Sequence, residues 1–242
     1  MNAQGLRSHM TAAGRLAALG GVNMLAGLGE EELSALAQRC SWGTFHAGNL
    51  IIGQHDESRD VLFLISGLAR VNVYSASGKQ VSFRDIRPGA IVGELSAIDS
   101  KPRSADVEAI EDCVFFIMPI GVFRAAMADH PSFAESLLVH LVTQVRSLTE
   151  RVFEFSTLAV RGRVRTELLR LARQRPAGDA DTVVLSPAPK HAEIAHRIST
   201  HREAVTRELS RLEELGVIAR EGRSLRIRDL AALKELSEDF QC

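Results

Sequence analysis

The chain has 242 residues, of which 45% are hydrophobic and 24% charged, and its formal net charge is −1. This composition is typical of a folded globular protein and excludes an intrinsically disordered chain, and the length suits two domains. No apolar run approaches the roughly 20 residues that a membrane-spanning helix needs. The start, MNAQGLRSHM, lacks the apolar segment of a signal peptide, and its residues 7–10 resemble a cloning remnant. Cys40, Cys113 and Cys242 match no disulfide or zinc pattern, so we expect a cytoplasmic protein.

Charge is distributed unevenly along the chain. Residues 1–160 carry 13 basic and 17 acidic residues, whereas residues 161–228 carry 15 basic and 9 acidic residues. All but one of those 15 basic residues are arginines. A basic module that follows an acidic one indicates a polyanionic partner for the second half of the chain.

The first half is predicted to be a helix followed by many short strands. Leu33, Leu36 and Ala37 recur at helical spacing within residues 30–40. Short apolar runs then alternate with turns that contain glycine, such as 66–67, 77–78 and 88–89. The expected strands are residues 50–52, 61–65, 69–74, 81–83 and 114–118. This spacing predicts a small antiparallel barrel or jelly roll.

A long amphipathic helix is predicted to begin near Pro131. Ser132 and Glu135 have the spacing of a capping box, which marks a helix start. Apolar residues then follow at the alternating spacing of a heptad seam, namely Leu138, Leu141, Val145, Leu148, Val152 and Phe155. Such a seam favours pairing with a second copy of the chain, so we expect a homodimer. The alternative is an ordinary amphipathic helix that packs on its own barrel.

The second half is predicted to contain a helix-turn-helix. A helix over residues 163–173 and a short strand at 182–185 come first. Two further helical patterns fill residues 190–215, with a break at 199–201 and a C-terminal stop at Gly216. Their apolar faces are Ile194, Ala195 and Ile198 in the first helix, and Val205, Leu209 and Leu212 in the second. Two short helices with a three-residue break are typical of a helix-turn-helix.

Polar residues around the second of these helices have the chemistry of DNA readout. Arg202, Glu203 and Arg207 lie where a recognition helix reaches the floor of the major groove. An arginine fork pairs with guanine O6 and N7, and a glutamate accepts a hydrogen bond from the cytosine amino group. Thr200 and His201, at the break, are further expected DNA contacts.

A basic wing is predicted after the helix-turn-helix. Residues 217–229 have the pattern of two strands around Gly222-Arg223, and Arg223 is suited to a phosphate contact. For the two helices at 190–215, the alternative to a helix-turn-helix is a plain helical hairpin whose charges are solvated.

A barrel, a heptad helix and a winged helix-turn-helix, in this order, resemble the cAMP receptor protein and FNR superfamily of bacterial transcription regulators. The resemblance covers residues 25–228. It implies an α+β fold with these parts: an N-terminal cyclic-nucleotide-binding β-barrel (jelly roll) at 20–130, a dimerisation helix and hinge at 131–160, a winged helix-turn-helix DNA-binding domain at 161–230, and a C-terminal tail at 231–242.

The resemblance also implies a ligand site. Gly93-Glu94-Leu95 and Arg103-Ser104-Ala105 match the phosphate-binding cassette of the family's nucleotide-binding members. Backbone N–H groups after Gly93 would cradle the phosphate of a cyclic nucleotide, and Arg103 would pair with it. Ser104 would donate its hydroxyl, and Glu94 would accept a hydrogen bond from the ribose 2′-OH.

The base end of this site departs from the cAMP receptor pattern. That receptor's Thr-Ser pair aligns with Leu148-Thr149, and Leu148 falls on the heptad seam, which leaves Thr149 as the expected base contact. Arg84 aligns near the ligand, where the receptor has a small hydroxyl residue. Ser104 is able to bond a guanine amino group as well as the phosphate, so cAMP and cGMP are both open. His55 replaces a usual glycine in an early turn, and histidine tolerates a positive φ better than most residues.

Other sensor chemistries and an enzyme are the alternatives. An iron–sulfur cluster needs about four cysteine ligands, which this chain lacks. A haem sensor has candidate ligands in His46, His55, His130 and His140, and a ligand-independent regulator is a further alternative. A metal-dependent cupin enzyme is the remaining alternative, but the second histidine of the cupin ligand set is absent from this chain. We therefore expect neither a metal nor catalysis.

We therefore expect a cytoplasmic, homodimeric, sequence-specific DNA-binding regulator that cAMP or cGMP controls. Its two recognition helices are expected in successive major grooves of a pseudo-palindrome, about 34–36 Å apart. The resemblance implies TGTGA-like half-sites, with Arg202 and Arg207 on guanines and Glu203 on a cytosine, and RNA polymerase as a further partner. The hinge is expected at residues 156–162, where Gly162 relaxes the helix, and no membrane partner is expected.

Overall fold

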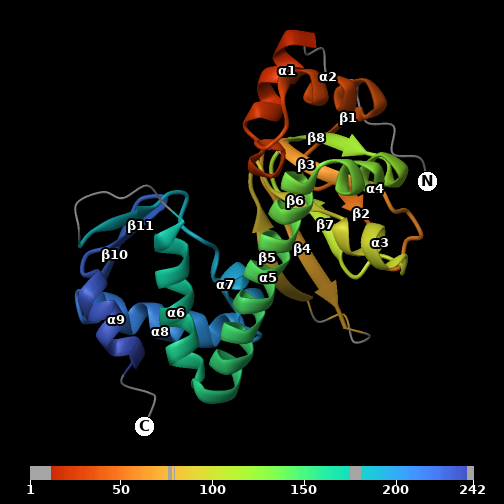
Figure 1. Cartoon of the computed structure of the whole chain (residues 1–242). Helices are drawn as coiled ribbons and strands as arrows, with labels where there is room; N and C mark the ends of the chain where they lie inside the picture. Colours follow the sequence, from red (N-terminus) through yellow and green to blue (C-terminus); the bar gives the residue numbers. More distant parts are fainter. Residues whose placement is uncertain (1–11, 76–77, 79, 175–180, 239–242) are drawn as a thin grey trace. The chain divides into compact units, whose positions relative to one another are not determined.

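The computed structural model describes residues 12–75, 78, 80–174 and 181–238, which form two compact units (Figure 1). The first unit comprises residues 1–144 and the second residues 145–242. This division lies within the predicted dimerisation helix, and not at either of its expected ends. Residues 1–11, Ser77 of the predicted turn at 77–78 and residues 175–180 of the predicted loop at 174–181 lie outside the described residues.

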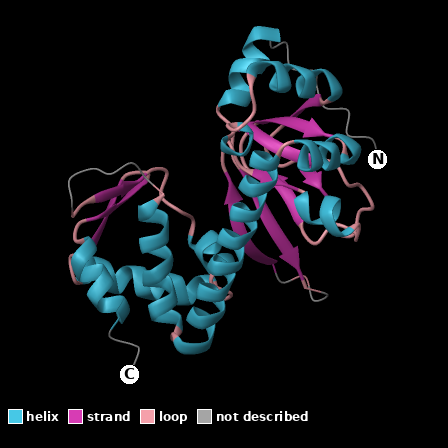
Figure 2. Cartoon of the chain, in the orientation of Figure 1, coloured by secondary structure: helices cyan, strands magenta, loops and turns pink. Residues whose placement is uncertain are grey.

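The first unit is a jelly roll of two four-stranded antiparallel sheets with helices at its ends (Figure 2). One sheet has the order β1-β8-β3-β6 and the other β2-β7-β4-β5. The predicted α+β fold with an N-terminal barrel is confirmed. The elements are α1 (Ala12–Gly20), η1 (Asn23–Leu25), α2 (Glu30–Arg39), β1 (Ser41–Phe45), β2 (Leu50–Ile52), β3 (Val61–Ser66), β4 (Ala69–Tyr74), β5 (Gln80–Ile86), β6 (Ile91–Val92), α3 (Glu94–Asp99), β7 (Asp106–Ala109), β8 (Cys113–Met118) and α4 (Ile120–Asp129).

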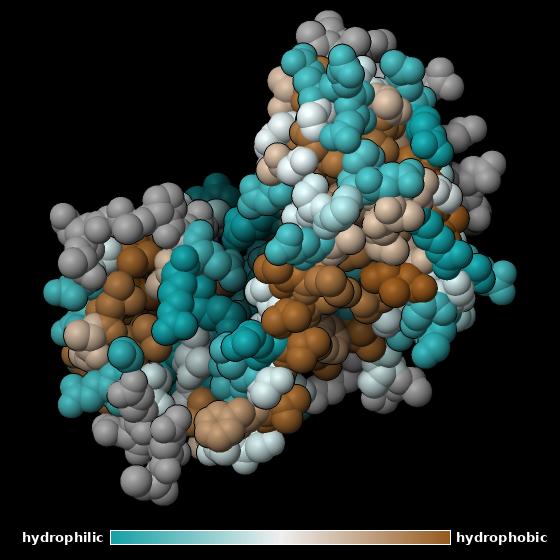
Figure 3. Space-filling model, viewed as in Figure 1, coloured by the Kyte–Doolittle hydropathy of each residue, from teal (hydrophilic) through white to brown (hydrophobic). Residues whose placement is uncertain are grey.

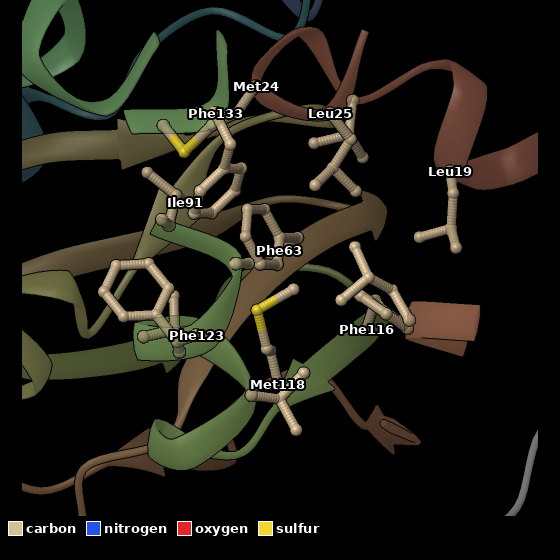
Figure 4. Close-up of a cluster of buried hydrophobic side chains, with 14 of the residues drawn as sticks. Leu19, Met24, Leu25, Phe63, Ile91, Phe116, Met118, Phe123 and Phe133 are labelled. Atoms are coloured by element: carbon tan, nitrogen blue, oxygen red, sulfur yellow. The ribbon is translucent and has the colours of Figure 1, made fainter. Parts of the chain in front are cut away.

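An aromatic cluster joins one sheet to the helices around it (Figure 4). Phe63 of β3 and Phe116 of β8 are register partners, and their ring centroids lie 6.1 Å apart. Phe123 of α4 meets Phe133 in a T-shaped contact at 5.7 Å. These side chains are fully buried, and burying each one stabilises the fold by roughly 1.5–3 kcal/mol. The cluster thereby fixes α4 and the start of the following helix against the sheet.

That following helix, α5, runs from Pro131 to Thr157. Proline suits the first turn of a helix because it lacks an N–H group that would have no partner there. The predicted capping box is wrong, because the helix begins at Pro131 and Ser132 lies inside its first turn, where its hydroxyl donates to Gly27 O at 3.3 Å. Phe133 and Leu137 pack into the aromatic cluster, whereas most of the heptad seam is exposed. The exposed fractions are 63% for Leu138, 62% for Val145, 47% for Leu148, 65% for Val152 and 37% for Phe155. Figure 3 shows apolar side chains gathered over this helix.

The second unit contains the last turns of α5 and a winged helix-turn-helix (Figure 1). Its elements are α6 (Val160–Arg173), β9 (Val183–Leu185), α7 (His191–Arg197), α8 (Arg202–Glu214), β10 (Ile218–Glu221), β11 (Ser224–Ile227) and α9 (Leu230–Glu238). The strands form one antiparallel sheet in the order β10-β11-β9. Val164, Leu168, Val205 and Leu212 are fully buried in its core.

Two details differ from the sequence predictions. The expected tail at 231–242 begins with helix α9, whose Leu233 is fully buried in the core. The helix break lies at residues 158–159, and Gly162 is inside α6 and not at the break. A Cβ on Gly162 would lie 3.4 Å from Leu158, an ordinary contact distance, so the packing at this position does not require glycine. Among the described residues, no helix is both long and apolar enough to cross a membrane.

Candidate functional sites

The first candidate site is built on a sharp turn at Gly93. Its φ of +89° is in the left-handed region, and it directly precedes the short helix α3. A Cβ at this position would lie 2.5 Å from Arg103 Nη1 and 2.8 Å from Asp60 O. Both the backbone conformation and the available space therefore require glycine here.

Arg103 is buried beneath this turn, with only 3% of its surface exposed. Its Nη1 donates to Gly93 O at 2.8 Å, its Nη2 to Asp60 O at 2.7 Å, and its Nε to Ser58 Oγ at 3.1 Å. Its backbone N–H also donates to Asp56 O, and the N–H of His55 donates to Arg103 O. Arg103 thus holds the loop at 53–60 against the turn at Gly93. Each terminal nitrogen of the guanidinium carries a second N–H group, which is a donor that a phosphate could use. A phosphate contact by Arg103 stays a prediction.

Glu94 is a buried carboxylate with three polar neighbours, and only 2% of it is exposed. Gln144 Nε2 donates to Glu94 Oε1 at 3.0 Å, while Arg84 Nη2 and His140 Nε2 lie 3.6 and 3.8 Å from the same oxygen. Burial raises the pKa of Glu94, but the neighbouring His140, the charge of Arg84 and the hydrogen bond from Gln144 outweigh it. The net pKa is below the usual range, so Glu94 is an anion able to accept a hydroxyl group.

The structure brings together some of the expected ligand residues and separates others. Arg84, on β5, is the register partner of Val71 on β4 and lies beside Glu94; its contact with a ligand stays a prediction. Ser104 and Leu95 are exposed, with Leu95 at 45%. Thr149 belongs to the second unit, where its hydroxyl donates to Val145 O at 2.9 Å. Its role as a base contact stays a prediction.

Sequence reasoning missed Gln144 as a member of this site. Nothing in the local sequence marks this glutamine, because its importance depends on α5 passing beside Glu94. His140 was considered only as a haem ligand, yet its Nε2 lies 2.7 Å from Gln144 Nε2. His55 adopts a φ of +72°, which agrees with the positive φ expected at that turn.

The other candidate haem ligands have carboxylate neighbours. His46 Nδ1 lies 3.4 Å from Asp112, and His130 Nδ1 lies 3.1 Å from Glu32. Over the part of the chain that the structure describes, no three His, Cys, Asp or Glu side chains are grouped to hold a metal ion.

The second candidate site is the helix-turn-helix. A turn with Ser199 at a φ of +51° separates α7 from α8, and Thr200 N donates to Ala195 O at 3.0 Å. Buried apolar residues on both helices hold them together, as the sequence predicts; they include Ile194, Ala195, Ile198, Val205 and Leu209. The hairpin of β10 and β11 turns at Gly222, whose φ is +58°.

The predicted DNA contacts are on the surface of this unit. Arg202, Glu203 and Arg207 are exposed on α8, and His201 is exposed immediately before it. Thr200 is partly exposed, and Arg223 is exposed at the tip of the wing. The exposure agrees with a role in binding, and the base or phosphate that each residue contacts stays a prediction.

Buried ion pairs on the inner side of α8 were also missed. Arg165 of α6 donates from Nε to Glu208 Oε1 at 2.6 Å, and from Nη1 to Leu236 O at 2.5 Å. Arg165 and Glu208 are 1% and 2% exposed. Glu167, also buried, pairs with Arg170 and lies 3.5 Å from Arg197 Nη1. These pairs fix the direction of α8 relative to α6 and α7.

We expect Arg103→Ala to destabilise the protein even without any ligand. The substitution removes the three side-chain hydrogen bonds of the guanidinium, so the free energy of unfolding should fall by about 2–3 kcal/mol. Urea unfolding at a fixed protein concentration measures this. Ser104→Ala is the control, because exposed Ser104 should change stability by less than about 0.5 kcal/mol. An unchanged unfolding midpoint for Arg103→Ala would show that these contacts do not hold the loop.

Comparison with known proteins identifies both units. The family model of the cyclic nucleotide-binding domain matches residues 43–130, and that of the Crp-like helix-turn-helix domain matches residues 162–236. The cyclic AMP receptor protein of Thermus thermophilus is 27% identical over 213 residues, which are 87% of this chain and 94% of that protein. The cAMP-activated global transcriptional regulator CRP of Escherichia coli is 24% identical over 190 residues, 77% of this chain and 89% of that protein.

Solved structures agree with this. A CRP-family transcriptional regulator, also from Thermus thermophilus, has a TM-score of 0.66 at 28% identity, over 81% of this chain and 96% of that one. A CooA mutant from Carboxydothermus hydrogenoformans has a TM-score of 0.76 over 90% of this chain and 95% of that one, and at 20% identity this likeness shows the fold alone. The chain therefore belongs to the CRP/FNR family of transcription regulators, and its relatives are regulators and not enzymes.

Proposed function

We propose that this chain is a cytoplasmic, homodimeric transcription regulator whose DNA binding is controlled by a cyclic mononucleotide, cAMP or cGMP. The observation that carries the proposal is the buried anionic Glu94 beside the Gly93 turn and Arg103, within the residues that the cyclic nucleotide-binding family model matches. The names of the relatives support cAMP as one candidate.

Each group of the ligand has a proposed partner in the chain. Backbone N–H groups after Gly93, a second N–H of Arg103 and the hydroxyl of Ser104 hold the cyclic phosphate. Glu94 accepts the ribose 2′-OH, a contact that a deoxyribonucleotide lacks. Thr149 and Arg84 are the proposed contacts to the base.

Glu94 also provides a route from the ligand to α5. Its Oε1 accepts a hydrogen bond from Gln144, and both Gln144 and its neighbour His140 are on α5. A ribose hydroxyl on Glu94 competes with the Gln144 amide, and the helix continues without a break to Thr157. The ligand shifts the arrangement of α5 by the difference between its affinities for the two states.

On the DNA, two recognition helices of a dimer occupy successive major grooves of a TGTGA-like pseudo-palindrome. Arg202 and Arg207 read guanines, Glu203 reads a cytosine, and Thr200, His201 and Arg223 contact the backbone. Bound in this way, the dimer contacts RNA polymerase. The exposed apolar seam of α5 supports the homodimer, since an apolar stripe of this kind needs a cover.

A second candidate is a regulator of the same fold that needs no cyclic nucleotide or responds to another effector such as haem. One observation favours it: all three nitrogens of the Arg103 guanidinium already donate to protein oxygens. The cassette is therefore held in place without a phosphate.

Titration calorimetry of the purified dimer with cAMP and with cGMP tests the effector. We expect saturable binding of at least one of them, and weaker binding after Ser104→Ala, which removes one phosphate donor without disturbing the buried contacts. Arg103→Ala should abolish binding, and its unfolding curve shows whether the variant is still folded. Binding of neither nucleotide by the wild type would favour the second candidate.

The readout of DNA by Arg202 is testable on altered operators. Arg202→Ala should weaken binding to the preferred sequence by about 1–3 kcal/mol and relax the choice at one base pair. Fluorescence anisotropy with single-base variants of the half-site measures both effects. An equal loss on every duplex would make Arg202 a phosphate contact.

The seam of α5 is testable by charge insertion. Val145→Glu places a carboxylate in the seam, and we expect it to shift a dimer toward monomer in sedimentation equilibrium. Thr143→Glu adds the same charge on the opposite face of the helix, where Thr143 only donates to Val139 O, and should leave the dimer intact. Equal behaviour of the two variants would argue against pairing through this seam.

A further inference from the structure

A hollow in the second unit has no role in the function proposed so far. Its volume is about 360 Å³, within the range of ligand pockets. It is lined by the segment at 188–192 and by Arg202 and Arg220, so three separate parts of the chain contribute to it. Lys190 and His191 belong to that segment, and the hollow therefore gathers three fixed cations and one histidine.

The fold explains why Arg220 reaches this hollow. In the wing hairpin Arg220 is the register partner of Leu225, and Ile218 is the partner of Ile227. Leu225, Ile218 and Ile227 are buried, so Arg220 lies on the hairpin face that turns toward the helices. Arg226, the partner of Ala219, lies on the opposite face and pairs with Glu221 at 2.7 Å.

The cations of the hollow lack the counterion that several arginines of this unit have. Arg165, Arg170 and Arg226 each pair with a glutamate. For Lys190, Arg202 and Arg220 there is no carboxylate partner within the residues that the structure describes. Cations gathered around a cavity without a counterion form a ready place for an anion.

The pKa of His191 reflects the positive potential of the hollow. Its Nδ1 lies 2.8 Å from Thr206 Oγ1, and that hydroxyl donates to Arg202 O at 3.0 Å. Burial lowers the pKa of His191, and the charges of Arg220 and Arg202 lower it further, while Glu213 acts in the opposite direction. A potential that opposes a proton on His191 favours a negative group at the same place.

We propose that this hollow binds one phosphate of the DNA backbone, with Lys190 and Arg220 as its two principal donors. The proposal rests on the DNA binding of the family. It adds a contact that positions the protein on the duplex and reads no base. Arg202 adds its charge at the edge of the hollow, and the wing is held against the duplex through Arg220 as well as through its tip.

The test is the salt dependence of DNA binding. Fluorescence anisotropy is measured over a series of salt concentrations on a TGTGA pseudo-palindrome and on a scrambled duplex of equal length, with and without cAMP and cGMP. We expect Arg220→Ala to weaken binding to both duplexes by the same factor, about tenfold, and Lys190→Ala to act likewise. The double variant should lower the slope of log K against log salt by about 2 per dimer, one phosphate for each protomer.

Arg226→Ala is the matched control, because it removes the same charge from the opposite face of the same hairpin. It should cost much less than Arg220→Ala, and Arg220→Lys should restore most of the loss. Equal losses for Arg220→Ala and Arg226→Ala, or a loss confined to the TGTGA duplex, would overturn the proposal. So would binding of inorganic phosphate in the hollow together with an unchanged DNA salt slope. If the wild-type protein bound neither duplex under any condition, the proposed DNA binding would itself be wrong. That outcome is distinguishable from a failure of the phosphate site alone.

Discussion

The ligand-binding unit depends on one buried guanidinium. Arg103 links Ser58 and Asp60, in the loop before β3, to the carbonyl of Gly93, at the start of α3. Gly93 has room for this arginine only because it has no side chain. The placement of Glu94, the next residue, follows from the turn that Arg103 holds. The phosphate proposed to bind Arg103 would therefore meet a group whose position is already set by the protein, which would lower the ordering cost of binding.

Buried carboxylates in both units follow a common rule. Glu94, Glu208 and Glu167 are almost fully buried, and each lies near an arginine. Removing one partner of a buried pair leaves an uncompensated charge and typically costs about 3–5 kcal/mol. These pairs therefore fix a geometry: Glu208 holds the inner side of α8, so the outer side presents Arg202 and Arg207 to solvent. Arg202 and Arg220, by contrast, are exposed at the hollow, where we propose that they meet an anion from outside the chain.

Much of the fold could be predicted from periodicity, and some of it could not. The strands at 50–52, 69–74 and 114–118, the seam of α5 and both helices of the helix-turn-helix have long or repeated patterns. β6 has two residues, and β7 is the four-residue DVEA, so neither gives a periodic signal. The acidic residues near α9 suggested a solvated tail, although Leu233 and its neighbours on one face pack against α6 and the rest of the core.

The candidate sites show the same division. Gly93, Glu94 and Arg103 could be chosen because their residue types form a motif. The partners of Arg103 could not be, because two of them are backbone carbonyls, which any residue provides. Arg220 was not chosen either, since an arginine in a short basic hairpin looks like its neighbours until the register shows which face it occupies.

The neighbours of Glu94 limit what the effector is able to do. Arg84 Nη2 lies 3.6 Å from Glu94 Oε1 and also donates to Ile91 O at 3.3 Å, so one end of its fork is already directed at protein oxygens. In the proposed function, a base contact by Arg84 would compete with its support of the carboxylate that is proposed to hold the ribose. Gln144 would likewise have two roles at this site, because its amide stabilises the same carboxylate that a 2′-OH would bind. In the proposed function, sugar recognition, base recognition and the position of α5 would share one carboxylate, and a substitution at any of these neighbours is expected to change more than one of them.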